Sequence, residues 1–297
     1  MGSAMGCLPA GENAFIASYC STVILNFPEA DFWVFEVVNR GIGDDTAKAV
    51  SLPHFPLLAS MLPSQYWAWM ATTRITYCFL FPDGRSRVYE VVLDAETGRQ
   101  VSVPLGSHHA WTDLEYEKCR HCPLKREEHP ECPAAKNLAF VVDDFQLEQS
   151  FEKVLVEVVT AERTYRKEVP IQDGLFSLVG LIMSTSACPH LDFLRPMARF
   201  HLPFSTSKET TVRSVSFYLL RQYFAAKQGS EPDYRLTELQ KLYDAIGEVN
   251  LGMAARMRSA SKTDAQANAI VVLDLFAQLL LDQVNDKLSS FEMLFSS

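Results

Sequence analysis

Four cysteines stand where their thiols could meet at one metal centre. Cys119 and Cys122 are three residues apart in Cys-Arg-His-Cys-Pro, so one tight turn can present both sulfurs to the same ion. Cys132 follows in the same segment, and Cys188 comes directly after a strongly apolar stretch. Structural zinc sites and cubane clusters both use four protein ligands as a rule. The sequence therefore predicts a four-cysteine metal site.

The arrangement of these cysteines favours a 4Fe-4S iron–sulfur cluster slightly over zinc. Three clustered cysteines and a distant one differ from the paired Cys-x-x-Cys knuckles of zinc ribbons, and the last three are each followed by proline, as in ferredoxin ligand runs. A Cys3His zinc site stays open, with His121, His129 or His190 in place of Cys188, and free thiols are a third alternative. We expect the metal to fix the cysteine loop to the helical core and so to act structurally, with redox sensing as the alternative role.

A second group of polar residues could bind an anion or cofactor downstream of Cys188. Arg199 and Arg213 could hold a phosphate or carboxylate, while His201 acts in acid–base chemistry and Glu209 lies nearby. A structural explanation competes and is favoured. Glu209 and Arg213 are spaced as a helical ion pair, and His201 is then a hydrogen-bonded linker residue.

Polar residues also interrupt the otherwise apolar sequence near the C-terminus. Their spacing places some of them on one helix face. We interpret the set as buried ion pairing between helices rather than as a binding site. The residues are Asn250, Arg256, Asp264, Asn268 and Asp274.

Composition narrows the class of protein. The net charge is −9 and the 27 Lys and Arg are scattered, which makes nucleic acid an improbable partner. The N-terminal residues show no basic segment followed by an apolar one, and no stretch is apolar enough for a membrane span, so we expect a cytoplasmic protein. Seven cysteines, an odd number, argue against a secreted disulfide framework. Motifs for dinucleotide binding, phosphate loops, serine hydrolases and zinc proteases are absent from the sequence.

Hydrophobic periodicity predicts an α+β protein with a small antiparallel β unit, hairpins and a C-terminal helical bundle around the Cys-rich loop. Asp83-Gly84 between two β-rich runs is a strong hairpin signal. Residues 174–185 are nearly all apolar, and their length favours a helix over a strand. The expected strands are 75–81, 88–93, 100–103, 137–142, 154–159 and 163–169, and the expected helices cover 212–224, 239–253 and the region from 263 onward.

The pattern suggests three parts. Residues 1–69 have several prolines and no sustained period, so we expect an irregular N-terminal extension, with Met70 as an alternative native start. The other reading is an irregular layer that packs its aromatic side chains on the main body. Residues 70–108 form a small β-hairpin domain, and residues 109–297 contain the Cys loop, a second hairpin and the helices.

The segments around the four cysteines, with the Pro-Met-Ala-Arg-Phe-His-Leu-Pro-Phe run at 196–204, resemble a family of uncharacterised bacterial proteins with a Cys-x-x-Cys-Pro loop. The resemblance covers residues 110–297 approximately and implies a bacterial cytosolic protein. It carries no known activity, so it assigns no catalytic residue.

Two functional classes follow from these residues. The first is a metal-stapled regulatory or adaptor protein that acts on a protein partner. The second is a metal-dependent enzyme or redox protein, which predicts an open cleft joining the cysteines to the Arg/His group. The first ranks higher because a four-cysteine site is coordinatively closed and no nucleophile and base pair stands out.

Overall fold

A computed structural model describes residues 72–102, 108–260, 265–286 and 288–296, together with three short strands nearer the N-terminus. The chain divides into two compact units, Met1–Met70 and Ala71–Ser297. This boundary lies beside the predicted end of the N-terminal extension. In the first unit, β1 (Val23–Asn26), β2 (Val34–Val37) and β3 (Val50–Ser51) form an antiparallel sheet where we had expected irregular structure. Strands of two to four residues are too short to show a period in the sequence.

The second unit is built on a five-stranded antiparallel sheet with the strand order β6-β5-β4-β7-β8. The pairing of β4 with β7 places Phe79 opposite Val156, so both predicted hairpins belong to one sheet. We had assigned the first hairpin to a separate domain at 70–108, whereas this pairing joins it to the rest of the unit. The strands are β4 (Thr72–Leu80), β5 (Ser86–Asp94), β6 (Gln100–Ser102), β7 (Lys153–Val159) and β8 (Thr164–Pro170).

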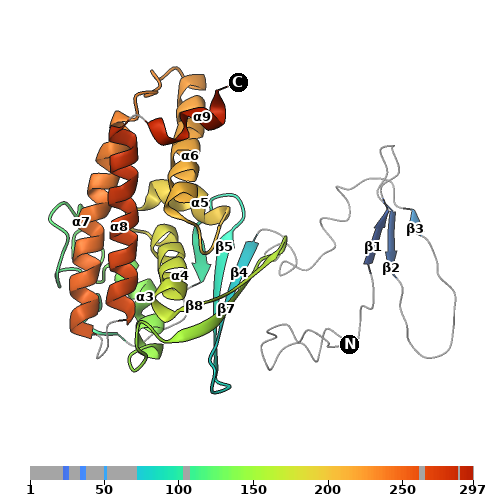
Figure 1. The fold of residues 1–297 in the computed structure, drawn as a ribbon, viewed down its shortest axis with the longest axis vertical. Coiled ribbons are helices and arrows are strands. Elements are labelled where there is room, and N and C mark those ends of the chain that lie inside the picture. The colour runs from blue at the N-terminus through green and yellow to red at the C-terminus, as the bar shows by residue number, and fades with distance from the viewer. Residues whose placement is uncertain are drawn as a thin grey trace. The chain divides into compact units, whose positions relative to one another are not determined.

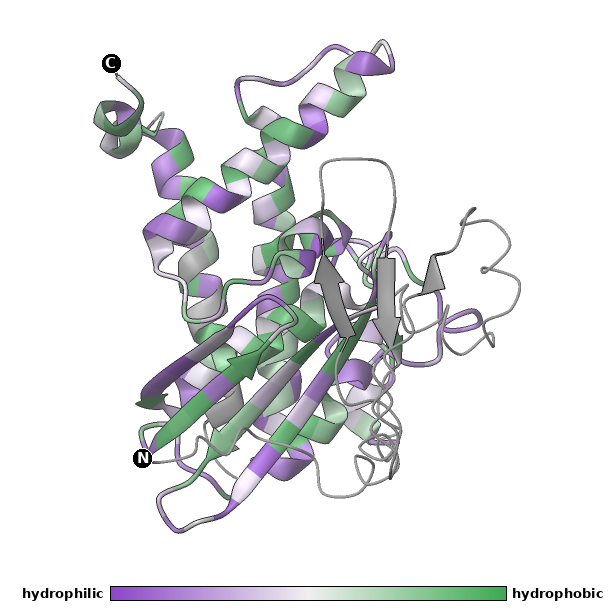
Figure 2. Cartoon of the chain, turned by 90° about the vertical axis from the view of Figure 1, so that its right-hand side faces the viewer, coloured by the Kyte–Doolittle hydropathy of each residue, from purple (hydrophilic) through white to green (hydrophobic). Residues whose placement is uncertain are grey.

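Helices gather on one side of this sheet (Figure 1). Hydrophobic and hydrophilic residues alternate along the long strands (Figure 2), as expected of strands with one buried face. The helices are α3 (Pro133–Asp144), α4 (Ile171–Thr185), α5 (Arg195–Arg199), α6 (Ser207–Lys227), α7 (Thr237–Ala260), α8 (Ala265–Asn285) and α9 (Glu292–Phe295), with short 3-10 turns at Ala110–Thr112, Asp192–Leu194 and Ser289–Phe291.

Helix α4 lies directly against the sheet and confirms the helix predicted at 174–185. A Cβ atom at Gly174 would lie 2.8 Å from Phe79 Cε1 and 2.9 Å from Val156 Cγ2, so this helix approaches β4 and β7 as closely as its backbone permits. Ile171, Leu175 and Leu178 continue the buried face, each with no exposed surface. The sheet and α4 thus form the rigid base from which the chain reaches Cys188.

One predicted strand was wrong. Residues 137–142 lie inside α3, which begins at Pro133 with Cys132 as its N-cap residue. Proline at the first helical position is pre-organised for a helix, and alanines at 134, 135 and 139 favour it further. The valines at 141 and 142 are fully or almost fully buried, so packing overrides their preference for a strand.

Candidate functional site

Backbone hydrogen bonds fix the segments that carry the cysteines. Cys119 and Cys122 share a tight turn in which the Cys122 amide donates to the Cys119 carbonyl over 3.0 Å. The Cys132 amide donates to the Thr112 carbonyl over 2.8 Å, just before α3 begins. Cys188 follows α4, and its amide donates to Ser186 Oγ over 3.3 Å. Three different parts of the fold therefore deliver the four sulfurs.

Two of the thiols, Cys119 and Cys188, are desolvated and lie close enough to other cysteines to be affected by their charge. Cys188 is buried, and Cys119 and Cys132 are partly buried against the core. Burial raises the pKa of Cys119 to about 11, with further contributions from the nearby Cys132 and Cys122. Burial likewise raises the pKa of Cys188 to about 12, and Cys132 and Cys119 add to the effect. The four predicted ligands therefore lie within one electrostatic neighbourhood.

This neighbourhood is not a preformed coordination shell. In the described part of the chain, no group of three or more His, Cys, Asp or Glu side chains is arranged so that it could hold a metal ion as it stands. Ligation requires the sulfur-bearing side chains to turn toward a common point. The set nevertheless fits a thiophilic metal chemically, because a metal deprotonates coordinated thiols whose pKa is high without it.

Helix α7 closes one side of the cysteine segment. A Cβ atom at Gly252 would lie 3.0 Å from Cys119 Sγ and 3.2 Å from the Glu117 carbonyl oxygen. Such distances are at or below the limit of ordinary contacts, so the helix backbone itself forms the wall. Gly252 was not among the predicted site residues, and only the packing of α7 reveals its role.

Arg256, one turn beyond Gly252, clamps the segment that leads to the cysteines. Its guanidinium donates to the carbonyls of Trp111 (2.6 Å), Asp113 (2.7 Å) and Leu114 (3.1 Å), and the residue is only 2% exposed. We had expected Arg256 to form an ion pair between helices, but no carboxylate of the described residues lies within salt-bridge distance. Its positive charge instead partly offsets the rise that burial causes in the pKa of Cys119.

Two histidines stack beside the cysteines. The rings of His121 and His190 have centroids 3.8 Å apart, and His190 Nε2 lies 3.0 Å from the His121 carbonyl oxygen. His121 Nε2 lies 3.0 Å from the carbonyl oxygen of Ala245, which can only accept, so this nitrogen carries the proton. Burial and the proximity of His190 lower the pKa of His121, which keeps the ring neutral. Its Nδ1 is then a buried lone pair, and it has no partner among the described residues.

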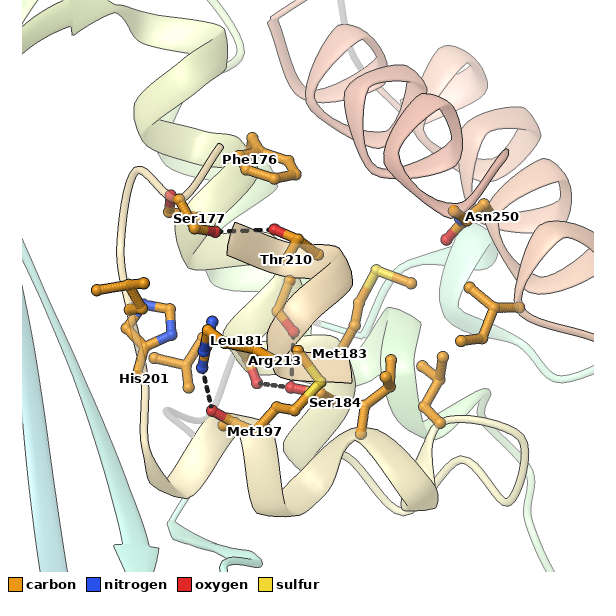
Figure 3. A pocket seen from close by; sticks show the side chains of 18 of the residues that line it. Phe176, Ser177, Leu181, Met183, Ser184, Met197, His201, Thr210, Arg213 and Asn250 are labelled. Carbon is orange, nitrogen blue, oxygen red and sulfur yellow. Dashed lines mark hydrogen bonds between the residues drawn. The ribbon is translucent and has the colours of Figure 1, made fainter. Parts of the chain in front are cut away.

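The predicted anion-binding residues separate in the structure. His201 and Arg213 line one cavity (Figure 3), whereas Arg199 and Glu209 are not among its described lining residues. Glu209 forms a capping box with Thr206 at the start of α6, with its carboxylate accepting from the Thr206 amide over 2.8 Å. Arg199 Nε donates to the Ala95 carbonyl over 3.4 Å.

The cavity has a volume of about 150 Å³ and lies among α4, α5, α6, α7 and α8. Tyr77 Oη lies 2.5 Å from His201 Nε2 at its edge. Burial raises the pKa of Tyr77, while burial and the charge of Arg213 lower the pKa of His201 to about 3, so the pair is neutral at physiological pH. Asn250 also lines the cavity, and we had expected it to be engaged in ion pairing.

The fold and the candidate site define an α+β domain with a helix-covered antiparallel sheet and a cysteine cluster beside α7. The chain belongs to the family described as Domain of unknown function (DUF6901), whose model matches residues 75–296. Searches of curated proteins and of solved structures gave no significant match. Among the helices of the described residues, none combines the length and the apolar character needed to cross a membrane.

Proposed function

We propose that the domain binds one metal centre through Cys119, Cys122, Cys132 and Cys188, and that the metal ties the cysteine loop to the end of α4. The observation that carries the proposal is that Cys119, Cys132 and Cys188 pack into one core, where Cys132 and Cys122 raise the pKa of Cys119, and Cys132 and Cys119 raise the pKa of Cys188. When bound, the metal supplies several strong bonds between segments that are distant in the sequence, and so contributes folding free energy.

Arg256 supports an anionic occupant. Four thiolates around Zn²⁺ carry a net charge of −2, and a cluster ligated by four thiolates is anionic as well. A buried guanidinium whose hydrogen bonds go to carbonyls retains a full positive charge to stabilise such a centre. The free Nδ1 of His121 supports the alternative of a Cys3His zinc site.

A regulatory or adaptor role in the cytoplasm fits this site better than catalysis. Four protein ligands leave no open coordination position for a substrate, so we expect a protein partner and a structural or redox-sensing metal. The enzyme alternative requires a cleft that joins the cysteines to the Arg/His group. None of the four cysteines is among the described residues that line the cavity of His201 and Arg213.

Anaerobic purification followed by absorbance spectroscopy and metal analysis tests the proposal. A brown protein that contains iron and has an absorbance band at about 400 nm identifies an iron–sulfur cluster, and a colourless protein with stoichiometric zinc identifies a zinc site. Protein without stoichiometric metal, which also fails to bind added Co²⁺ through thiolates, refutes the metal centre.

Single substitutions then identify the ligands. Cys132→Ser should lose the metal, and Lys125→Ala, at an exposed position in the same loop, should retain it. His121→Asn distinguishes the two ligand sets, because it weakens metal binding only if the imidazole replaces Cys188. Full metal content in Cys132→Ser would exclude the proposed ligand set.

A further inference from the structure

The cavity between the helices has a single charged residue in its described lining. Arg213 Nη2 donates to the carbonyls of Met197 (3.0 Å) and Phe200 (2.8 Å), and no described carboxylate lies within salt-bridge distance of the guanidinium. Glu209, the acid one turn earlier, is held by Thr206 in the capping box. The remaining N–H groups of Arg213 are therefore available to a planar anion.

Asn250 supplies a second polar group at a different part of the same cavity. The residue is 3% exposed, and its Nδ2 has no hydrogen-bond partner among the described residues. Figure 3 shows Asn250 on α7, away from His201 and Arg213, with the apolar side chains between them. A buried amide without a hydrogen-bond partner is destabilising, and an acceptor on a bound molecule would remove this cost.

The space between these polar groups is apolar and of defined size. Leu181, Met183, Leu191, Leu194 and Ile246 are among its lining residues. A cavity of about 150 Å³ with an aliphatic lining accommodates a benzene ring in proteins. The cavity therefore matches one ring or a compact branched chain, and is too small for a nucleotide or a long acyl chain.

We propose that this cavity binds a compact apolar carboxylate, of the size of benzoate, that carries a hydrogen-bond acceptor at the end opposite its carboxylate. The carboxylate pairs with Arg213, the apolar body fills the space between α4 and α7, and the acceptor takes the hydrogen bond of Asn250 Nδ2. His201 stays neutral and hydrogen-bonded to Tyr77, so it adds no second charge. The proposal does not depend on the metal centre.

Calorimetry on the full-length protein with 4-hydroxybenzoate, benzoate and benzamide tests each part. Wild-type protein should bind 4-hydroxybenzoate best and benzamide at least about tenfold more weakly than benzoate, since a charged hydrogen bond is worth at least this factor. Arg213→Gln should remove the preference for a carboxylate. Arg221→Gln, an exposed arginine of the same helix, should retain it.

Asn250→Leu keeps the shape of the side chain and leaves Arg213 untouched, so it tests the proposal even if Arg213→Gln fails to fold. The Asn250→Leu variant should bind 4-hydroxybenzoate and benzoate with equal affinity. Three results overturn the proposal: no saturable binding up to about 10 mM of any of these acids, equal affinity for benzoate and benzamide in the wild-type protein, or an equal loss in Arg213→Gln and Arg221→Gln.

Discussion

Two glycines of α7 test how closely this helix approaches the cysteine segment. A Cβ atom at Gly247 would meet only Asp274 Oδ1, at the ordinary distance of 3.9 Å. A Cβ atom at Gly252 would meet Cys119 Sγ at 3.0 Å and the Glu117 carbonyl oxygen at 3.2 Å. Substitution by alanine gives both positions the same gain in helix propensity, about 0.8–1.0 kcal/mol, so the pair isolates the packing difference.

The expected difference follows from what has to move. Glu117 contributes a backbone oxygen and has a left-handed φ of 43°, so its segment cannot give way as a flexible side chain would. Overpacking of this kind costs about 1–3 kcal/mol. Gly247→Ala should therefore stabilise the protein by about 1 kcal/mol, while Gly252→Ala should range from neutral to about 2 kcal/mol destabilising.

Urea unfolding of reduced protein, followed by circular dichroism, measures both variants. The dependence of the unfolding free energy on urea should stay unchanged, so that the shift in midpoint reports stability alone. The same measurement with a chelator shows whether the penalty depends on bound metal. Equal stabilisation by the two substitutions would refute the close approach of α7 to Cys119, and with it the wall of the proposed metal centre.

Two further perturbations probe the polar groups beside the two sites. Arg256→Met leaves three carbonyls, two of them buried, without their donor and should destabilise the protein by about 2–4 kcal/mol, against less than about 0.5 kcal/mol for the exposed Arg258→Met. Equal melting temperatures for the two variants would contradict the clamp. Burial and Arg213 lower the pKa of His201 to about 3, so at mildly acidic pH the unfolded chain binds a proton at His201 that the folded chain does not bind. The free energy of unfolding should therefore fall as the pH drops from about 6.5 toward 3, by up to about 1.4 kcal/mol per pH unit. His201→Gln should remove this contribution, and an unchanged pH slope of the urea midpoint would show that His201 is not its source.

Most strands of the five-stranded sheet could be predicted from the sequence. The β4–β5 hairpin places Tyr77 opposite Tyr89, and its turn contains the predicted Asp83-Gly84 pair, with Gly84 at a positive φ of 87°. Local turn chemistry and alternation specify such a unit without help from the rest of the chain. The pairing of β4 with β7 is different, because about seventy residues separate them and no local signal encodes the partner.

The misread strand at 137–142 shows where periodicity fails. Six apolar residues fit a buried strand and a buried helix equally well, and only the flanking sequence separates them. Pro133 directly after Cys132 was that signal, since proline favours the first turn of a helix. The residue that ends the cysteine run is thus also the start of α3.

That the cysteines lie near one another could be expected from the sequence because three of the four are local, whereas the residues packed against them could not be predicted. Three of the thiols lie within fourteen residues of each other, so their proximity needs only one loop. The contribution of α7 depends on a tertiary contact more than one hundred residues away. No spacing rule could have connected Arg256 with the carbonyl of Trp111.

The polar interruptions of α7 belong to two environments, and helical geometry explains why. Gly252 and Arg256 are four residues apart and share the face toward the cysteine segment. Asn250, two residues before Gly252, points to a different side of the helix and lines the cavity. Ion pairing between helices would have required complementary charges on one face. Because the residues divide between two faces, Arg256 clamps carbonyls with no described carboxylate beside it, and Asn250 Nδ2 has no acceptor among the described residues. These two arrangements are the basis for proposing an anionic metal centre beside Arg256 and a bound acceptor beside Asn250.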